Sequence, residues 1–330
     1  MKCALIVPYF GKLPEFFQLF LKSCAPNRHF TWYIFTDDTT EFDYPDNVKA
    51  NYTSFEETQT QFKQALGDKI VLERTYKLCD YKPAYGLVYS ELLKEYDYWG
   101  HCDIDLLFGN LEKYVVPIMQ KGYDKIFAAG HLTLYRNTIE NNHMFRMPLN
   151  GELLFEEYSQ RERNYGFDEN GGNKKNVHNI FIEYGRTVYA QDLSFNCSDK
   201  YYSFHRSVYD TCAGEWITQK KKNAAYFWCN GSVREFILDR GRVSEQEYIY
   251  MHFQGRKSLT VSSRNDGDAI SIQPYGFITG VCLPKKPAEC KMFIPKCGGA
   301  HEFRMTIFRL RLKLGKIKIL VLKKGTRHDT

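Results

Sequence analysis

The N-terminal part of the chain alternates between the apolar pattern of buried strands and that of a helix. CALIVPYF (3–10) and FTWYIFTDD (30–38) are short apolar runs that end at the edge of polar segments, as buried strands do. Between them, LPEFFQLFLKSC (13–24) repeats its apolar residues at helical spacing. A strand, a helix and a second strand in this order predict a βαβ unit and a parallel sheet. Ligands bind at the carboxyl ends of such strands. The residues that we place at the rim of this crevice are Pro8, Tyr9, Phe10 and Asp38.

The middle of the chain continues the α/β pattern. KPAYGLVYSELLKEY (82–96) predicts a helix with proline near its start, and it leads into YWGHCDIDLLFG (98–109), a strand interrupted by two acids. YDKIFAAGHLTLYRN (123–137) predicts a pair of strands, and EYIYMHFQGRK (247–257) predicts a last clear strand with a basic end. The polar segment 137–176 predicts helices and a loop. We therefore expect one α/β domain over 1–285, followed by an extension over 286–330.

Two aspartates stand one residue apart in the apolar run YDYWGHCDIDLLFG. On a strand, residues i and i+2 point to the same face, so Asp103 and Asp105 would project side by side. Two adjacent carboxylates repel each other, and burying them without a partner is costly. A metal ion or a basic side chain should therefore lie between them.

A histidine and several basic residues complete a candidate metal site. His252 leaves a strand just before Gly255, Arg256 and Lys257, and Lys82 begins the helix before the acidic strand. Divalent cations prefer carboxylate oxygens, and manganese also accepts an imidazole nitrogen. We expect Mn²⁺, or Mg²⁺, to be held by Asp103, Asp105 and His252. Lys82 and Lys257 would offset the charge of a bound diphosphate, and Gly255 would let the backbone come close to it.

WGHCDIDLLFG and HFQGRK together resemble the motifs of GT-A glycosyltransferases. The resemblance is nearest to the family 8 retaining galactosyl- and glucosyltransferases and to bacterial proteins from polysaccharide and capsule gene clusters. It implies a GT-A fold, a Rossmann-like mixed sheet flanked by helices, here with a basic C-terminal extension. In the family, the DxD strand and an H-x-x-G-x-K segment hold manganese and the diphosphate of a UDP-sugar. His252, Gly255 and Lys257 match that segment, while Ser258 and Leu259 replace a Pro-Trp pair.

The same resemblance points to residues around the transferred sugar. AAGHLTLYRN falls where the family lines the donor pocket, which implies that Gly130, His131 and Thr133 face the sugar. YGFDENGG falls where the family has an acidic pair next to the reacting carbon. The residues that this implies as catalytic are Asp168 and Glu169, with Asp192 as a different candidate. Other interpretations stay open: the acidic pair also suits an exposed turn, Asp192 a local cap, and His131 a core histidine.

Charge is concentrated at the end of the chain. The formal net charge is +6, and residues 302–330 hold nine Lys/Arg and two acids, a net of +7. The remainder is therefore near −1, which gives no electrostatic support for nucleic-acid binding. FRLRLKLGKIKILVLKK (308–324) alternates apolar and basic residues, which suits an amphipathic strand. It would either pack on the body as an edge strand or attach to an anionic membrane surface.

The cysteines and the apolar runs indicate where the protein works. Its 10 cysteines include no CxxC pair, which is typical of reduced thiols in the cytoplasm. The N-terminus lacks the features of a signal peptide, and no apolar run approaches the roughly 18 residues that span a bilayer. We expect a cytoplasmic protein that is peripheral, at most, on the inner face of the plasma membrane.

The function that this sequence favours is a metal-dependent glycosyltransferase. It would move galactose or glucose from a UDP-sugar to a hydroxyl of a surface polysaccharide or lipid-linked glycan precursor. One alternative is a nucleotidyltransferase built on a related sheet, which should carry a Gly-rich phosphate loop after its first strand. The other alternative is a non-catalytic adaptor that binds sugars or nucleotides.

Overall fold

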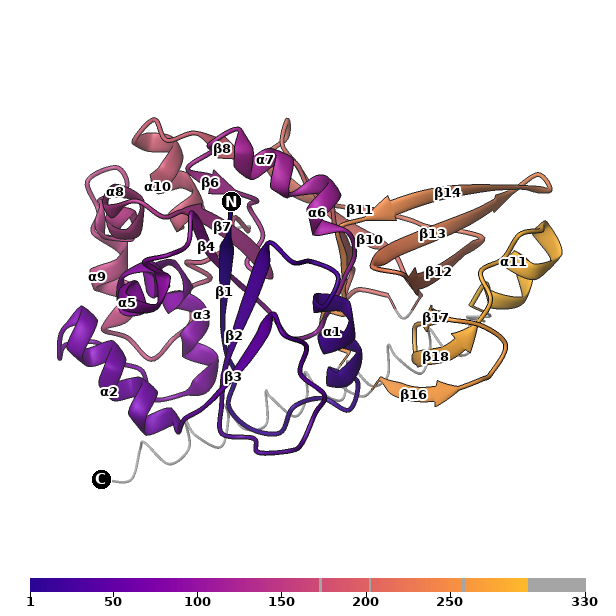
Figure 1. The fold of residues 1–330 in the computed structure, drawn as a ribbon. Coiled ribbons are helices and arrows are strands. Elements are labelled where there is room, and N and C mark those ends of the chain that lie inside the picture. Colours follow the sequence, from indigo (N-terminus) through magenta and orange to yellow (C-terminus); the bar gives the residue numbers. More distant parts are fainter. Residues whose placement is uncertain (172–173, 202, 257–258, 296–330) are drawn as a thin grey trace, which may run out of the picture.

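A seven-stranded mixed sheet forms the centre of the protein in the computed structural model, which describes residues 1–171, 174–201, 203–256 and 259–295 (Figure 1). The strand order is β3-β2-β1-β4-β7-β6-β8. The first four strands in this order run parallel, and β7 is antiparallel to both of its neighbours. The strands are β1 (Cys3–Pro8), β2 (Phe30–Thr36), β3 (Val48–Tyr52), β4 (Tyr98–Cys102), β6 (Lys125–Ile126), β7 (Leu132–Arg136) and β8 (Val188–Tyr189).

Helices bury both faces of this sheet, which explains why β1 is apolar at nearly every position. Alternate residues of β1 belong to two different cores: Leu5 packs on one face with Phe17 and Phe20, and Ile6 on the other with Tyr81 and Trp99. The first core lies under α1 (Phe17–Cys24), α6 (Leu111–Tyr114) and α7 (Val116–Gln120). Helices on the other face are α2 (Phe55–Leu66), α3 (Leu78–Tyr81), α4 (Tyr85–Val88), α5 (Ser90–Leu93), α8 (Ile139–His143), α9 (Leu154–Ser159) and α10 (Val177–Glu183).

The predicted βαβ unit and the strand pair are confirmed, but the predicted helix over 82–96 is not continuous. It divides into a 3₁₀ turn (Lys82–Ala84), α4 and α5, because Tyr89 leaves helical geometry at φ −109° and ψ 25°. The 3₁₀ turn nevertheless begins at Lys82, whose side chain is buried.

A second sheet brings the end of the predicted last strand to the acidic segment. Its order is β11-β10-β9-β15-β5. Strand β15 (Tyr250–His252) pairs antiparallel with β5 (Leu106–Phe108), and His252 lies opposite Leu106. Because Leu106 directly follows Asp105, this register places the histidine next to the aspartates. The other strands are β9 (Phe195–Cys197), β10 (Arg206–Asp210) and β11 (Glu215–Gln219).

A third, six-stranded sheet forms a lobe beside the central domain, with α11 (Pro287–Phe293) packed on it through a Phe227–Phe293 contact (Figure 1). This lobe was not predicted, and the expectation that EYIYMHFQGRK (247–257) holds the last strand is wrong, because three further strands follow it between Thr260 and Val281. Asn230–Gly231 and Arg240–Gly241 make its hairpin turns with positive φ, and Asn-Gly is a strong hairpin signal. Its strands are β12 (Ala224–Cys229), β13 (Ser232–Asp239), β14 (Arg242–Tyr248), β16 (Thr260–Ser263), β17 (Ala269–Gln273) and β18 (Gly276–Val281).

Two expectations about the chain as a whole can be compared with the fold. Every cysteine within the described ranges is a free thiol. None of the helices described is long and apolar enough to cross a membrane. Of the predicted extension, residues 286–295 are described and include α11, while the basic segment 308–324 lies outside the described residues.

Candidate metal and donor site

The candidate site lies at the carboxyl ends of β1 and β4. The chain runs from β1 to β2 and β3 on one side, then crosses to β4 on the other, so the strand order reverses between β1 and β4. Such a switch point is where parallel α/β sheets bind their ligands. Pro8 ends β1, with Tyr9 and Phe10 directly after it, and Asp103 and Asp105 follow β4.

The two aspartates stand in a short link between strands, not within one strand as the sequence analysis expected. Strand β4 ends at Cys102 and β5 begins at Leu106. The link is held at both ends, because Asp103 N–H donates to the His131 carbonyl (3.2 Å) and Phe253 N–H donates to the Asp105 carbonyl (2.9 Å). Ile104 is buried in the core while both carboxylates are partly exposed. The two acids therefore share one side of the link, as predicted.

Asp103, Asp105 and His252 converge on one point. His252 Nε2 lies 3.3 Å from Asp105 Oδ1 and 3.9 Å from Asp103 Oδ2, and one ligand atom from each residue lies within 4.8 Å of the others. The other ring nitrogen of His252, Nδ1, is 2.9 Å from Asn196 Oδ1, so its N–H donates to that amide oxygen and Nε2 faces the acids. Metal-binding histidines are oriented in this way. Two carboxylates and one directed imidazole fit a divalent cation, and these residues could hold one.

Charges at this point are strongly coupled. Burial disfavours the imidazolium of His252, but Asp105 and Asp103 outweigh burial and raise the pKa of His252. Burial also opposes ionisation of Asp103, yet Lys82 and His252 bring the pKa of Asp103 down to about 2. A proton on His252 therefore offsets part of the negative charge of the aspartates, and a cation that binds through Nε2 has to displace it.

Lys82 is buried behind the metal residues and all three of its N–H donors have acceptors. Its Nζ lies 2.8 Å from Asp103 Oδ1, 3.1 Å from Asp168 Oδ2 and 2.9 Å from the Gly130 carbonyl. In this structure the Lys82 ammonium binds two carboxylates and a carbonyl. The predicted contact between Lys82 and a diphosphate therefore stays a prediction. Gly130 makes the arrangement possible, since a Cβ there would come within 2.6 Å of Asp168 Oδ2.

The segment 127–131 forms a rigid wall beside the metal residues. Each of its five consecutive carbonyls accepts a hydrogen bond from a different donor. These bonds run from Lys125 Nζ to Phe127 (2.5 Å), Asn170 N to Ala128 (2.9 Å), Thr133 Oγ1 to Ala129 (2.8 Å), Lys82 Nζ to Gly130 (2.9 Å) and Asp103 N to His131 (3.2 Å). Phe127 adopts a positive φ of 72°, a conformation that tight anchoring can maintain.

The side chain of His131, the last residue of this wall, packs against the ring of His252. The two rings lie 4.4 Å apart between centroids, and His131 Nδ1 is 2.8 Å from the Tyr250 hydroxyl. Burial and the neighbouring His252 hold the pKa of His131 well below its usual range. Its Nε2 has no hydrogen-bond partner among the described residues.

The predicted acidic residues have different environments. Asp168 is buried beside Lys82, and burial raises its pKa to about 7. Glu169 next to it is exposed. Asp192 is a local cap, as one interpretation held: its Oδ1 accepts from the backbone N–H and hydroxyl of Ser194, and its Oδ2 from Tyr209 N–H (3.2 Å).

Among the remaining predicted site residues, Asp38 and Tyr9 lie close to the loop after β1. Hydrogen bonds from Thr40 and from Leu13 N–H lower the pKa of Asp38, whose carboxylate thereby anchors the loop after β1. Burial, together with Asp105 and Asp38, raises the pKa of Tyr9. Gly255 adopts φ +71° in an exposed turn, and Lys257 lies outside the described residues.

Several residues that build the site were not predicted. Asn170 uses all four of its polar groups, binding Ala128, Trp216, Tyr209 and Asn176, and so fixes the loop that bears Asp168. Asn196 orients His252, and Tyr250 binds His131. Only tertiary contacts identify these residues, because neither an asparagine nor a tyrosine near a strand has a distinctive sequence pattern.

Comparison with known proteins places the chain in a family. Residues 5–280 match the model described as "Family of unknown function (DUF6625)", which is most of the chain. The chain belongs to this family. No curated protein matches its sequence.

Among solved structures, this DUF6625 member is similar to mouse xyloside xylosyltransferase 1 in its apo form. The TM-score is 0.37 at 11% sequence identity, over 60% of this chain and 89% of that chain. A similarity this low carries no argument about activity, so the functional argument for the DUF6625 member rests on the geometry of its own site.

The buried Lys125 gives a prediction about pH and stability. Burial lowers the pKa of Lys125 to about 7, so between about pH 7 and 10 the unfolded chain binds one more proton than the folded protein. The free energy of unfolding should therefore rise with pH relative to a Lys125→Met variant, by up to about 1.4 kcal/mol per pH unit. Urea unfolding of both proteins over this range measures the difference. Lys121→Met, at an exposed lysine, is the control, and parallel curves for wild type and Lys125→Met would contradict the assignment.

Proposed function

We propose that this protein is a metal-dependent glycosyltransferase that transfers a hexosyl unit from a UDP-sugar to a hydroxyl group. One observation carries the proposal: two carboxylates and an imidazole from distant parts of the chain converge at the switch point of a parallel sheet. A nucleotide fits such a crevice, and a divalent cation fits the three side chains. A sugar nucleotide needs both.

The residues around the crevice divide the task of binding the donor. Asp103, Asp105 and His252 hold the cation, Mn²⁺ or Mg²⁺, which when bound supplies positive charge to a departing diphosphate. Pro8, Tyr9, Phe10 and Asp38 shape the nucleoside side of the crevice. Lys82 fixes Asp103 by a 2.8 Å contact, and Gly255 and Lys257 complete the diphosphate side.

Asp168 and Glu169 are the residues that we place beside the reacting carbon. Asp168 is held against Gly130 and Lys82, and its pKa of about 7 would let it exchange a proton near neutral pH. One of the two carboxylates would stabilise positive charge on the sugar or accept the proton of the incoming hydroxyl. Asp192 caps Ser194 and Tyr209, so we do not place it at the reacting carbon.

The loop after β1 argues against the nucleotidyltransferase alternative. A phosphate loop offers free backbone N–H groups, usually from several glycines. Here the loop has a single glycine, Gly11, and its N–H donates to the Asp37 carboxylate at 2.7 Å. A negative charge therefore occupies the position where a phosphate would bind. This contact favours the glycosyltransferase.

The fold and acceptor that we propose follow the sequence resemblance. We infer a GT-A arrangement like that of family 8 enzymes, acting in bacterial surface-polysaccharide or capsule synthesis on a glycan or lipid-linked glycan precursor. The mixed α/β sheet with its crevice after β1 and β4 supports this inference.

Removing one metal-binding carboxylate tests the proposal. Titration calorimetry with UDP should show binding at least about tenfold tighter with Mn²⁺ than with EDTA, and Asp105→Asn should lose that difference. Asp46→Asn, at an exposed aspartate remote from the crevice, should keep it. A hydrolysis screen of UDP-sugars with the same proteins extends the test to turnover. Two results would contradict the proposal and favour the adaptor alternative. One is a UDP affinity that is the same with Mn²⁺ and with EDTA, and the other is an equal gain in affinity from Mn²⁺ in wild type and Asp105→Asn.

We also propose that the basic segment attaches the protein to the cytoplasmic face of the plasma membrane. The charge distribution in the sequence supports this: a net of +7 over residues 302–330 against about −1 elsewhere. Each basic residue near an anionic surface contributes about 1 kcal/mol. Deleting residues from Phe303 onward should abolish sedimentation with phosphatidylserine-containing vesicles at low salt, whereas unchanged sedimentation would contradict the proposal.

A further inference from the structure

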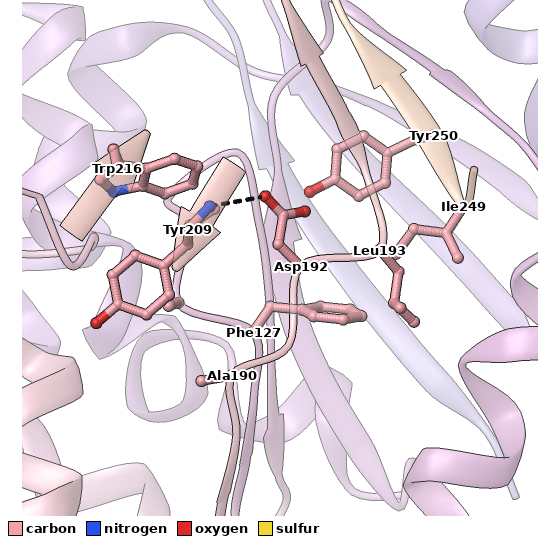
Figure 2. A pocket seen from close by; sticks show the side chains of 10 residues that line it. Phe127, Ala190, Asp192, Leu193, Tyr209, Trp216, Ile249 and Tyr250 are labelled. Carbon is pink, nitrogen blue, oxygen red and sulfur yellow. Dashed lines mark hydrogen bonds between the residues drawn. The ribbon is translucent and has the colours of Figure 1, made fainter. Parts of the chain in front are cut away.

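A small pocket lies among Phe127, Asp192, Trp216 and Tyr250 (Figure 2). Its lining is mostly apolar, and Asp192 is its one charged residue. The other lining residues are five aliphatic and four aromatic ones: Ala128, Ala129, Ala190, Leu193, Ile249, Phe127, Tyr209, Trp216 and Tyr250.

One wall of the pocket is shared with the metal site. Tyr250 lines the pocket and its hydroxyl lies 2.8 Å from His131 Nδ1. The ring of His131 lies 4.4 Å from that of His252 and 6.3 Å from that of Trp216. His131 and Tyr250 thus link His252 to the pocket through direct contacts, and the sugar of a donor whose diphosphate lies at His252 would face this wall.

The size of the pocket limits what it can accept. Its centre has room for a group about as large as one water molecule or one methyl group. A sugar ring does not fit, but a small substituent of a sugar ring does. The alanine side chains make the centre apolar, so a hydroxyl there would lose hydrogen bonds to water without replacing them.

Asp192 supplies a hydrogen-bond acceptor at the edge of the apolar centre. Its side chain is only 8% exposed, and three N–H or O–H groups from Ser194 and Tyr209 already donate to it. Figure 2 shows the carboxylate between Tyr209 and Tyr250. A carboxylate accepts about four hydrogen bonds, so capacity for one further donor remains. The nearby Arg206 is 3.9 Å away, and its Nε and Nη2 donate to the carbonyls of Ser194 and Asp192.

We propose that this pocket binds the N-acetyl group of the donor sugar, so that the substrate is a UDP-N-acetylhexosamine. The methyl group fills the space between the alanines, and the amide N–H donates to the Asp192 carboxylate. This inference rests on the proposed function and replaces glucose and galactose as the transferred sugars. Their 2-hydroxyl is too short to fill the pocket and too polar for its apolar centre.

Titration calorimetry on the full chain with Mn²⁺ tests the inference, using UDP, UDP-N-acetylglucosamine, UDP-N-acetylgalactosamine, UDP-glucose and UDP-galactose. Each N-acetylated donor should bind at least about tenfold tighter than its hexose counterpart, as a filled methyl pocket allows. Ala190→Leu, which occupies the pocket, should reduce this ratio below about threefold and leave the affinity for UDP within about twofold. Leu193→Phe fills the pocket from a second position and should act in the same way. Ala213→Leu, on the exposed turn between β10 and β11, should keep the preference.

The outcomes separate the two proposals. Wild-type protein that binds UDP but not N-acetylated donors preferentially would overturn the pocket assignment alone. So would a preference that survives both filling variants while UDP affinity is retained. A protein that fails to bind UDP with Mn²⁺ would overturn the proposed function, and the pocket assignment with it.

Discussion

The antiparallel pairing of β15 with β5 determines the chemistry available to this protein. Its register sets His252 opposite Leu106, so the imidazole lies beside two carboxylates that come from a distant part of the chain. Shifting the register by one residue would turn His252 to the other face of the sheet. Asn196, on the neighbouring β9, then fixes which nitrogen faces the aspartates. The candidate metal site therefore depends on backbone pairing first and on side-chain hydrogen bonds second.

A buried lysine, Lys82, connects the candidate metal residue Asp103 to the carboxylate of Asp168 in the interior. Asp103 and Asp168 share one buried lysine as their cationic partner, and the third N–H of Lys82 binds the wall at Gly130. Removing one member of such a buried group leaves an uncompensated charge, which costs several kcal/mol. The wall 127–131 is thus tied to both the metal residues and the loop of Asp168. Phe127, Ala128 and Ala129 of the same wall also line the pocket of Asp192.

The sequence predicted those parts of the fold that have local patterns. The strands of the βαβ unit, its helix, and the proximity of Asp103, Asp105 and His252 followed from apolar periodicity and from chemistry. The acidic segment was placed on a strand because alternation continues through it, whereas the chain actually leaves strand geometry for three residues between Cys102 and Leu106. The three-stranded hairpin array from β12 to β14 was missed although Asn230–Gly231 signalled its first turn.

Other features depend on contacts between distant segments and have no local signal. Lys82 was expected to face a diphosphate, and only the folded chain shows that Asp103, Asp168 and Gly130 take up its donors. The pocket likewise combines residues of four separate segments, around Phe127, Asp192, Trp216 and Tyr250.

The most direct test of the account is pulsed electron paramagnetic resonance of the protein with Mn²⁺ and UDP. We expect coupling of the ion to one imidazole nitrogen and to phosphorus, with the nitrogen coupling lost in His252→Ala. A bound Mn²⁺ without nitrogen coupling, or one whose coupling survives in His252→Ala, would contradict the central claim.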